Sequence, residues 1–327
     1  MKTNDQTVHI LNAELLDSDG KTRLTNATIA GSQFIETTGH PILEDGSTII
    51  DAKGNLLIPG LHDHHTHLIA YAASLVSINC GPPGVVSEAD LKSALRGQPG
   101  HHWLRGTGYH ESVTGHLDRQ WLDAWAPDRP IRVQHRSGRL WIVNSPGMEM
   151  IANAALSLAP HERDRLTSED GRLYDVDELL GNLTRSDIPP VKLASQQLAA
   201  FGVTGINDMT PSNNAETWQW FSELQVSQDL LQKVRMSGRP ALIDCRQTPR
   251  LSVGETKVHL HDSSLPDFDD FVSTITESHE KQRNVAVHCV TEVELVYTLS
   301  AFRSASTLAG DRIEHASVIP PALIEQL

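Results

Sequence analysis

The stretch VAVHCVTEVELVYTLSAF, residues 285–302, contains a β-prone run that passes directly into a helical pattern. Val285–Val290 is short, β-branched and mostly apolar, which predicts a strand. Thr291 and Glu294 have the spacing of a capping box, in which two side chains bind free backbone N–H groups at the start of a helix. The stretch therefore predicts a strand followed by a helix over residues 291–302.

The same order of strand and helix recurs on both sides of this stretch. Strands are predicted over residues 202–209, 234–237, 255–260 and 312–316. Helices are predicted over 190–200, 214–233 and 267–279, with Asp267 as an N-cap and Pro320 or Pro321 as the start of another helix. Repeated strand–helix units are typical of a parallel α/β fold, and we expect a (β/α)8 TIM barrel, which carries its chemistry where its strands end.

The chain before residue 190 lacks this rhythm. Residues 1–55 contain short β-prone runs broken by glycine turns, which predict a small β-structure. The barrel is expected over 56–327, with strand one at 56–69, an insertion at 70–190 and strands two to six at 190–327. The insertion would lie over the barrel mouth as a lid or substrate-shaping region. Alternatively, its four tryptophans form its own core: Trp103, Trp121, Trp125 and Trp141.

The composition is that of a soluble globular protein. The 327 residues are 39% hydrophobic and 21% charged, which allows one barrel or two domains. No apolar run approaches the roughly 18 residues of a membrane-spanning helix, and the start does not resemble a secretory signal. Cys80, Cys245 and Cys289 form no CxxC pair, so a cytoplasmic location is expected. A net charge of −14 with scattered basic residues argues against a nucleic-acid partner.

The run IPGLHDHHTHL, Ile58–Leu68, contains four histidines. On a strand, His65 and His67 would point to one face, which suits two ligands of one metal ion. The chain has 17 histidines and the same spacing recurs elsewhere, so this pattern alone is a weak signal. The stronger signal is that three consecutive predicted strands each carry a candidate ligand near the C-terminal end: Lys257, His288 and His315.

Together these residues resemble the amidohydrolase superfamily of metal-dependent hydrolases. Pro59–His67 resembles its PGxxDxHxH signature, ETKVHLHDS (255–263) its fourth strand with a metal-bridging lysine, and VAVHCV and DRIEHAS its fifth and sixth strands. Within the insertion, WLRGTGYHES and LDAWAPDRPIRVQHRSGRLWIVNS resemble the branch called amidohydrolase family 3, or YtcJ-like. The resemblance covers nearly the whole chain, and it implies that residues 1–55 contribute to a composite β-sandwich.

The resemblance also implies a divalent-metal site. His65 and His67 would bind the more buried ion, His288 and His315 a second ion, and Lys257, carboxylated to a carbamate, would bridge the two. Such a binuclear centre lowers the pKa of a shared water, so that a metal-bound hydroxide would hydrolyse the C–N bond of an amide or an N-substituted formamide. Zinc is the default for a histidine-rich site, with manganese, iron and nickel left open.

Other residues near the predicted strand ends have alternative roles. Asp63 could orient the HxH histidines or approach the metal. If Lys257 faces inward, so do His259 and His261, which could bind metal or substrate. Arg139 stands where many branch members have histidine, and could pair with an acidic substrate group or with a nearby carboxylate. Further histidines, His62 and His64, are expected on the other face of the strand, against helices or loops. A structural ion pair is expected between Arg312 and Glu314, on the face opposite His315.

The chain ends after the sixth predicted strand. We therefore expect a barrel truncated there, either as a fragment or completed by a second chain. The strand-eight aspartate that the family uses for proton transfer is not in this chain, so the catalytic residue is unknown. The alternatives to a C–N hydrolase are a deaminase of the same superfamily, which lacks the bridging lysine, and a non-catalytic relative. The expected partner is a small-molecule substrate, with a homo-oligomer left open.

Overall fold

The computed structural model describes residues 7–326, apart from residues 17, 32, 38–45, 97–101 and 185–188. The chain divides into two compact units, Met1–Leu61 and His62–Leu327. None of the helices among the described residues combines the length and the apolar character needed to cross a membrane.

The first unit forms one β-sheet. Its strands are β1 (Val8–Leu16), β2 (Thr22–Ala30), β3 (Gln33–Thr37), β4 (Thr48–Asp51) and β5 (Leu56–Leu57). They lie in the order β3-β2-β1-β4, with β5 also paired to β1. Strand β1 runs antiparallel to β2 and parallel to β4. The predicted β-structure is therefore confirmed where this unit is described, whereas the β-sandwich stays a prediction, and residues 1–6 and 38–45 of the predicted region lie outside the described residues.

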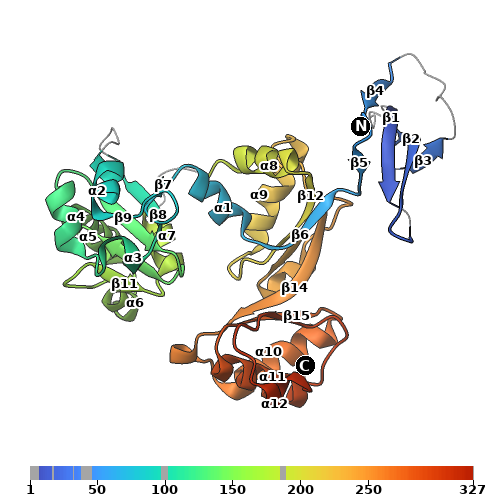
Figure 1. Cartoon of the computed structure of the whole chain (residues 1–327). Helices are drawn as coiled ribbons and strands as arrows, with labels where there is room; N and C mark the ends of the chain where they lie inside the picture. Colours follow the sequence, from blue (N-terminus) through green and yellow to red (C-terminus); the bar gives the residue numbers. More distant parts are fainter. Residues whose placement is uncertain are drawn as a thin grey trace. The chain divides into compact units, whose positions relative to one another are not determined.

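The second unit contains a curled sheet of six strands (Figure 1). These are β6 (Leu61–Thr66), β12 (Val203–Asp208), β13 (Lys233–Gly238), β14 (Leu251–His259), β15 (Val285–Cys289) and β16 (Arg312–His315). Each strand neighbours the next one in this order, and the pairings from β12 to β16 are parallel. Successive parallel strands joined by helices are the topology of a TIM-barrel-like domain, so the predicted α/β class is confirmed.

Helices join the strands of this sheet. The principal ones are α1 (Leu68–Leu75), α8 (Val191–Ala200), α9 (Ala215–Val226), α10 (Phe268–Glu280) and α11 (Glu292–Ala305), followed by the short α12 (Pro321–Ile324). Short 3-10 turns precede and follow β14: η2 (Pro240–Asp244) and η3 (Asp262–Ser264). Ile206 of β12 packs with Trp218 and Phe221 of α9 in one apolar cluster. Burial of each such side chain contributes about 1.5–3 kcal/mol to stability, and this fixes which face of the sheet the helices cover.

The predicted helix starts are confirmed. Asp267 accepts hydrogen bonds from the backbone N–H groups of residues 269 and 270, and Thr291 and Glu294 form the capping box of α11. Several boundaries differ from the prediction, two of them by four residues or more. Helix α9 ends at Val226, because the chain turns at Gln228, which has a φ of 63°. Strand β14 begins at Leu251 rather than at residue 255, because its first residues pair with β13.

The insertion has a sheet of its own, which the sequence did not predict. Its strands, β7 (Ile78–Asn79), β8 (Leu104–Tyr109), β9 (Ile131–His135), β10 (Leu140–Val143) and β11 (Arg172–Tyr174), are neighbours in that order. Short helices surround them: α2 (Glu88–Arg96), α3 (Glu111–Thr114), α4 (Arg119–Trp125), α5 (Ser145–Ala154), η1 (Ala155–Ser157), α6 (Pro160–Arg165) and α7 (Asp177–Thr184). The four tryptophans pack in its two apolar clusters, as expected if they form its own core. A lid role stays a prediction.

Candidate metal centre

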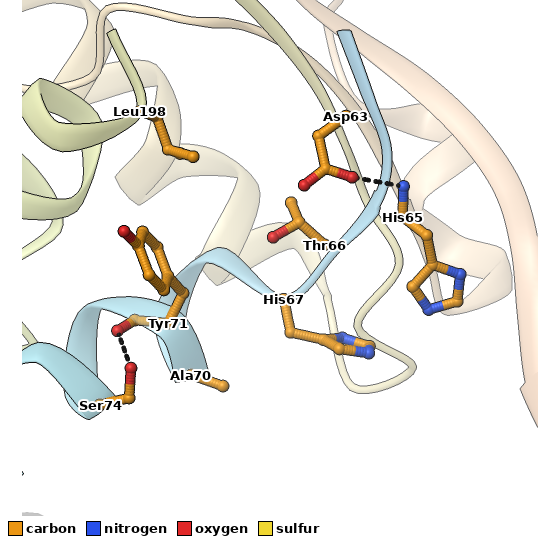
Figure 2. A pocket seen from close by; sticks show the side chains of 8 residues that line it. All are labelled: Asp63, His65, Thr66, His67, Ala70, Tyr71, Ser74 and Leu198. Atoms are coloured by element: carbon orange, nitrogen blue, oxygen red, sulfur yellow. Dashed lines mark hydrogen bonds between the residues drawn. The ribbon is translucent and has the colours of Figure 1, made fainter. Parts of the chain in front are cut away.

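His65 and His67 lie where β6 runs into α1. His65 is in the strand, whereas His67 follows it as the N-cap of α1. The prediction that both lie on one strand is therefore wrong for His67, yet their ring centroids are only 5.3 Å apart. Figure 2 shows both rings on the same side of the ribbon in this view. The Nδ1 atom of His67 is 3.1 Å from the Thr210 hydroxyl, which follows β12, so two strand ends hold this ring.

The register of β14, β15 and β16 brings further side chains to one face of the sheet. His259 pairs with His288, and His288 pairs with Glu314. Two residues earlier on β14 and β15, Lys257 pairs with Ala286. Partners in register on parallel strands point to the same face. The intervening residues, such as Val287, pack against the helices in an apolar cluster. Lysine, histidines and glutamate therefore occupy the face that the helices leave free.

His315 reaches the same cluster by breaking the alternation of its strand. It follows Glu314 directly, so a regular strand would send the two side chains to opposite faces. His315 instead has a φ of 71° and Ala316 a φ of 43°, which turn the backbone at the end of β16. Positive φ values are rare outside glycine because the side chain crowds the backbone. The expectation that Glu314 lies opposite His315 is therefore wrong at this strand end.

Six histidine rings form a continuous series across the strand ends. The successive ring-centroid distances are 5.3 Å for His67–His65, 5.0 Å for His65–His315, 4.5 Å for His315–His288, 4.1 Å for His288–His259 and 4.3 Å for His259–His261. The structure thus brings together all four histidines that the sequence proposed as ligands. It also joins His259 and His261 to them.

The surroundings favour neutral imidazoles. Burial, helped by repulsion from neighbouring histidines, lowers the pKa of His288 to about 3 and that of His259 to about 4. Burial also lowers the pKa values of His67 and His315. A neutral imidazole keeps a lone pair for a metal ion, whereas a protonated ring has none. At neutral pH these histidines are therefore ready to act as ligands.

Lys257 is the most confined member of the group. The residue is 7% exposed, and its Nζ atom has no hydrogen-bond partner among the described residues. Burial lowers its pKa to about 8, although nearby Glu314 opposes this shift. An unpaired amine inside a protein is costly, so a partner or a chemical modification is expected there.

Glu314 is a site residue that the sequence analysis missed. It was expected only to pair with Arg312, and its Oε1 atom is indeed 2.7 Å from Arg312 Nε. Its Oε2 atom, however, is 2.5 Å from Nδ1 of His65. Burial raises the pKa of Glu314, but the bond from His65 and the cations of Lys257 and Arg312 outweigh this and hold it at about 2. The pairing of Glu314 with His288 on the neighbouring strand is the feature that could have assigned Glu314 to the face of the histidines.

Three further residues named in the sequence analysis, Asp63, Arg139 and His62, make other contacts than expected or only one of the alternatives. Asp63 accepts a hydrogen bond from the backbone N–H of His65 rather than from its ring, as Figure 2 shows. Arg139 is held by Asp175 through two contacts of 2.7 and 2.8 Å, which supports its pairing with a nearby carboxylate. His62 binds Asn207 of β12 and packs over Gly205 of the same strand, so the expectation that it lies against helices or loops is wrong.

A cavity of about 550 Å³ opens beside the HxH histidines (Figure 2). It is lined by Asp63, His65, Thr66, His67, Ala70, Tyr71, Ser74 and Leu198. Tyr71 donates a hydrogen bond to Gln197 and so presents a fixed ring to this space. The space is open to solvent, with a mostly apolar wall and a few polar groups beside the histidines.

The donor chemistry of this cluster fits a divalent metal. Neutral imidazoles are common ligands of zinc and related metals, and a buried amine with a lowered pKa is the form of lysine that can react with carbon dioxide. Within the described residues, no three or more histidine, cysteine, aspartate or glutamate side chains are grouped to hold one ion as they stand. The ligand set expected from the sequence needs only two histidines for each ion, because the carbamate of Lys257 would be shared between the ions.

The chain combines a parallel α/β sheet with histidines and a buried lysine at its strand ends. The fold is similar to that of an uncharacterized metal-dependent hydrolase from Pyrococcus horikoshii OT3, with a TM-score of 0.69 and 17% identity over 98% of this chain and 72% of that chain. A second such hydrolase, from Pyrococcus furiosus, gives a TM-score of 0.67 and 20% identity over 98% and 74% of the two chains. The model of the amidohydrolase family matches residues 48–327, and the chain belongs to that family.

One curated relative has a stated activity. The chain is 24% identical over 237 residues to the N-substituted formamide deformylase of Arthrobacter pascens. The match covers 64% of this chain and 44% of that protein, so the chain spans less than half the length of this relative.

Proposed function

We propose that this chain carries the metal site of an amidohydrolase that cleaves a C–N bond in an amide or an N-substituted formamide. The observation that carries the proposal is the buried amine of Lys257, which has no hydrogen-bond partner among the described residues. It lies on the same face of the sheet as His259 and His288, whose pKa values are lowered by burial. The similarity to the formamide deformylase supports this choice of bond. The alternative of a deaminase is less favoured, because that branch of the superfamily lacks the bridging lysine.

In this proposal His65, His67, His288 and His315 hold divalent metal, with zinc as the first candidate, and Lys257 joins them as a carbamate. A bound divalent ion polarises a carbonyl group and lowers the pKa of water. The chain's own part is to keep the imidazoles neutral, to exclude water from Lys257 and to offer the cavity beside His65 to the substrate. The three cysteines are free, which fits a reducing cytoplasm.

The test combines metal analysis with a hydrolysis assay. Purified protein loaded with zinc should bind the ion stoichiometrically. Release of formate from a small N-alkyl formamide is expected where a longer form of the chain or a second chain supplies the strand-eight aspartate, and the rate is measured on that form. Replacement of a metal ligand, His288→Asn, should lower the rate by about 100-fold or more, since ligand loss removes metal chemistry. The matched control is His161→Asn, because His161 is an exposed histidine of α6 outside the cluster.

Two outcomes would contradict the proposal, and a third would invalidate the assay. Absence of stoichiometric metal would indicate a non-catalytic relative. A single ion with an unmodified lysine, together with release of ammonia from a cyclic amidine, would indicate a deaminase. Equal loss of activity in His288→Asn and His161→Asn would show that the assay reports general damage rather than ligand loss.

A further inference from the structure

We propose that Glu314 is a positioning residue for His65: its carboxylate accepts the Nδ1 proton of this ring and leaves Nε2 as the atom that binds metal. This inference rests on the proposed function, which assigns His65 to the metal. It adds a residue that the proposed function does not use, since Glu314 would act on the metal only through His65.

The contact is short and enclosed. Glu314 Oε2 is 2.5 Å from His65 Nδ1, and Glu314 is 6% exposed. A carboxylate can only accept, so the ring nitrogen must donate, and the lone pair of a neutral His65 then lies on Nε2. Arg312 holds the other carboxylate oxygen at 2.7 Å, so the acceptor itself is fixed in place. The pair therefore sets both the tautomer and the orientation of the ring.

Other contacts of the HxH histidines cannot do the same for His65. Asp63 binds its backbone N–H and leaves the ring free to turn. His67 has its own partner in Thr210, whose hydroxyl can donate or accept and so does not impose a tautomer. Among the described residues, Glu314 is the group that hydrogen-bonds to the His65 ring.

An ion pair alone does not explain this arrangement. Arg312 and Glu314 are two residues apart on β16, so they could pair without contacting β6. Instead Glu314 reaches His65 on β6, and Arg312 Nη2 is 3.2 Å from the backbone oxygen of His64. Carboxylates that accept from a ligating histidine raise its basicity, and their loss typically weakens metal binding 10- to 100-fold.

The experiment compares three variants of the full chain. Glu314→Ala removes the acceptor, and Glu314→Gln keeps an acceptor while abolishing the ion pair with Arg312. The matched control is Glu255→Ala: Glu255 is 4% exposed and lies 3.2 Å from Arg235 on the same sheet, and among the described residues its carboxylate hydrogen-bonds to Arg235 and Ser237 and to no histidine ring. Zinc dissociation constants are measured by competition with a chelator. The tautomer of His65 is read from ¹⁵N chemical shifts of the metal-free protein, assigned with His65→Gln.

Glu314→Ala should bind zinc about 10- to 100-fold more weakly, Glu314→Gln should recover most of this loss, and Glu255→Ala should stay close to wild type. The Nδ1-protonated tautomer is expected for His65. Unchanged affinity in Glu314→Ala, equal weakness in the Gln variant or an Nε2-protonated His65 would overturn the inference. If Glu314→Ala does not fold, the inference is tested by the zinc affinity of Glu314→Gln and by the tautomer of His65 in the wild-type chain.

The result also separates the inference from the proposed function. A wild-type chain that binds no zinc would overturn both. A wild-type chain that binds zinc, with Glu314→Ala binding equally well, would overturn only the role of Glu314.

Discussion

Lys257 combines burial, a lowered pKa and the absence of a described hydrogen-bond partner. An ordinary lysine is almost fully protonated at neutral pH, and a protonated amine cannot attack carbon dioxide. With a pKa of about 8, roughly a tenth of the Lys257 side chains are neutral at pH 7. Burial thus increases the neutral fraction of this amine, the form that the proposed carbamate requires, and the proton released when an amine binds carbon dioxide would pass to water.

We expect a lysine carbamate at Lys257 when the protein is held in ¹³C-bicarbonate with zinc. The carbamate should give a ¹³C resonance that disappears in Lys257→Arg, because a guanidinium does not become neutral near pH 8. The control is Lys192→Arg, since Lys192 is an exposed residue paired with Asp229. In the metal-free protein the signal should grow as the pH rises towards 8. A resonance that persists in Lys257→Arg would refute this assignment.

One buried carboxylate joins the loops that follow β14 and β15. Glu294 of α11 is 3% exposed and accepts from the backbone N–H groups of Asp262, Val290 and Thr291. It therefore completes the capping box of α11 and at the same time ties down the chain beyond His259 and His288. A buried carboxylate with three backbone donors is a stronger restraint than an exposed cap.

Glu294→Ala should destabilise the protein by about 2–4 kcal/mol, since it leaves buried backbone donors without an acceptor. Asp267→Ala removes an N-cap of α10 at a more exposed position and should cost only about 1 kcal/mol. Urea unfolding of the two variants measures the difference. Equal costs would mean that Glu294 acts only as a helix cap and does not join the two loops.

Elements whose start or strand-end residues are marked by neighbouring residues in the chain can be predicted from the sequence. The capping residues Asp267 and Thr291 and the strand-end positions of Lys257 and His288 follow from spacing and alternation, and the structure places them as expected. The contact of Glu314 with His65 depends on residues far apart in sequence, and the approach of His315 depends on a positive φ that alternation cannot predict. The short strands of the insertion were missed because two to six residues carry little periodic signal.

The first and last strands of the six-stranded sheet contact each other through side chains. Glu314 and Arg312 of β16 contact His65 and His64 of β6, although these strands stand at opposite ends of the strand order. The curl of the sheet thus brings the histidines of all the contributing strands into one electrostatic environment. Within this environment, burial and repulsion from neighbouring cationic groups lower the pKa values of His67, His259, His288 and His315.

This environment predicts how stability depends on pH. The pKa of His288 is about 3 in the folded chain and about 6.5 when unfolded, so the unfolded chain takes up a proton first as the pH falls. Stability should therefore be complete above pH 6.5 and decrease on acidification. The contribution of His288 is on the order of 1 kcal/mol per pH unit, allowing for its partial exposure.

Urea unfolding of the metal-free protein between pH 6.5 and 5.0 reports on the buried histidines together, because most carboxylates stay ionised there, and His288 is one of several contributors. His288→Gln should flatten the pH dependence in this window, whereas His161→Asn, at an exposed site, should leave it unchanged. Added zinc should steepen the dependence in the wild type, since protons and metal compete for the same nitrogen atoms. A wild-type stability that rises on acidification, or an equal slope in His288→Gln, would mean that the folded protein does not keep this imidazole neutral.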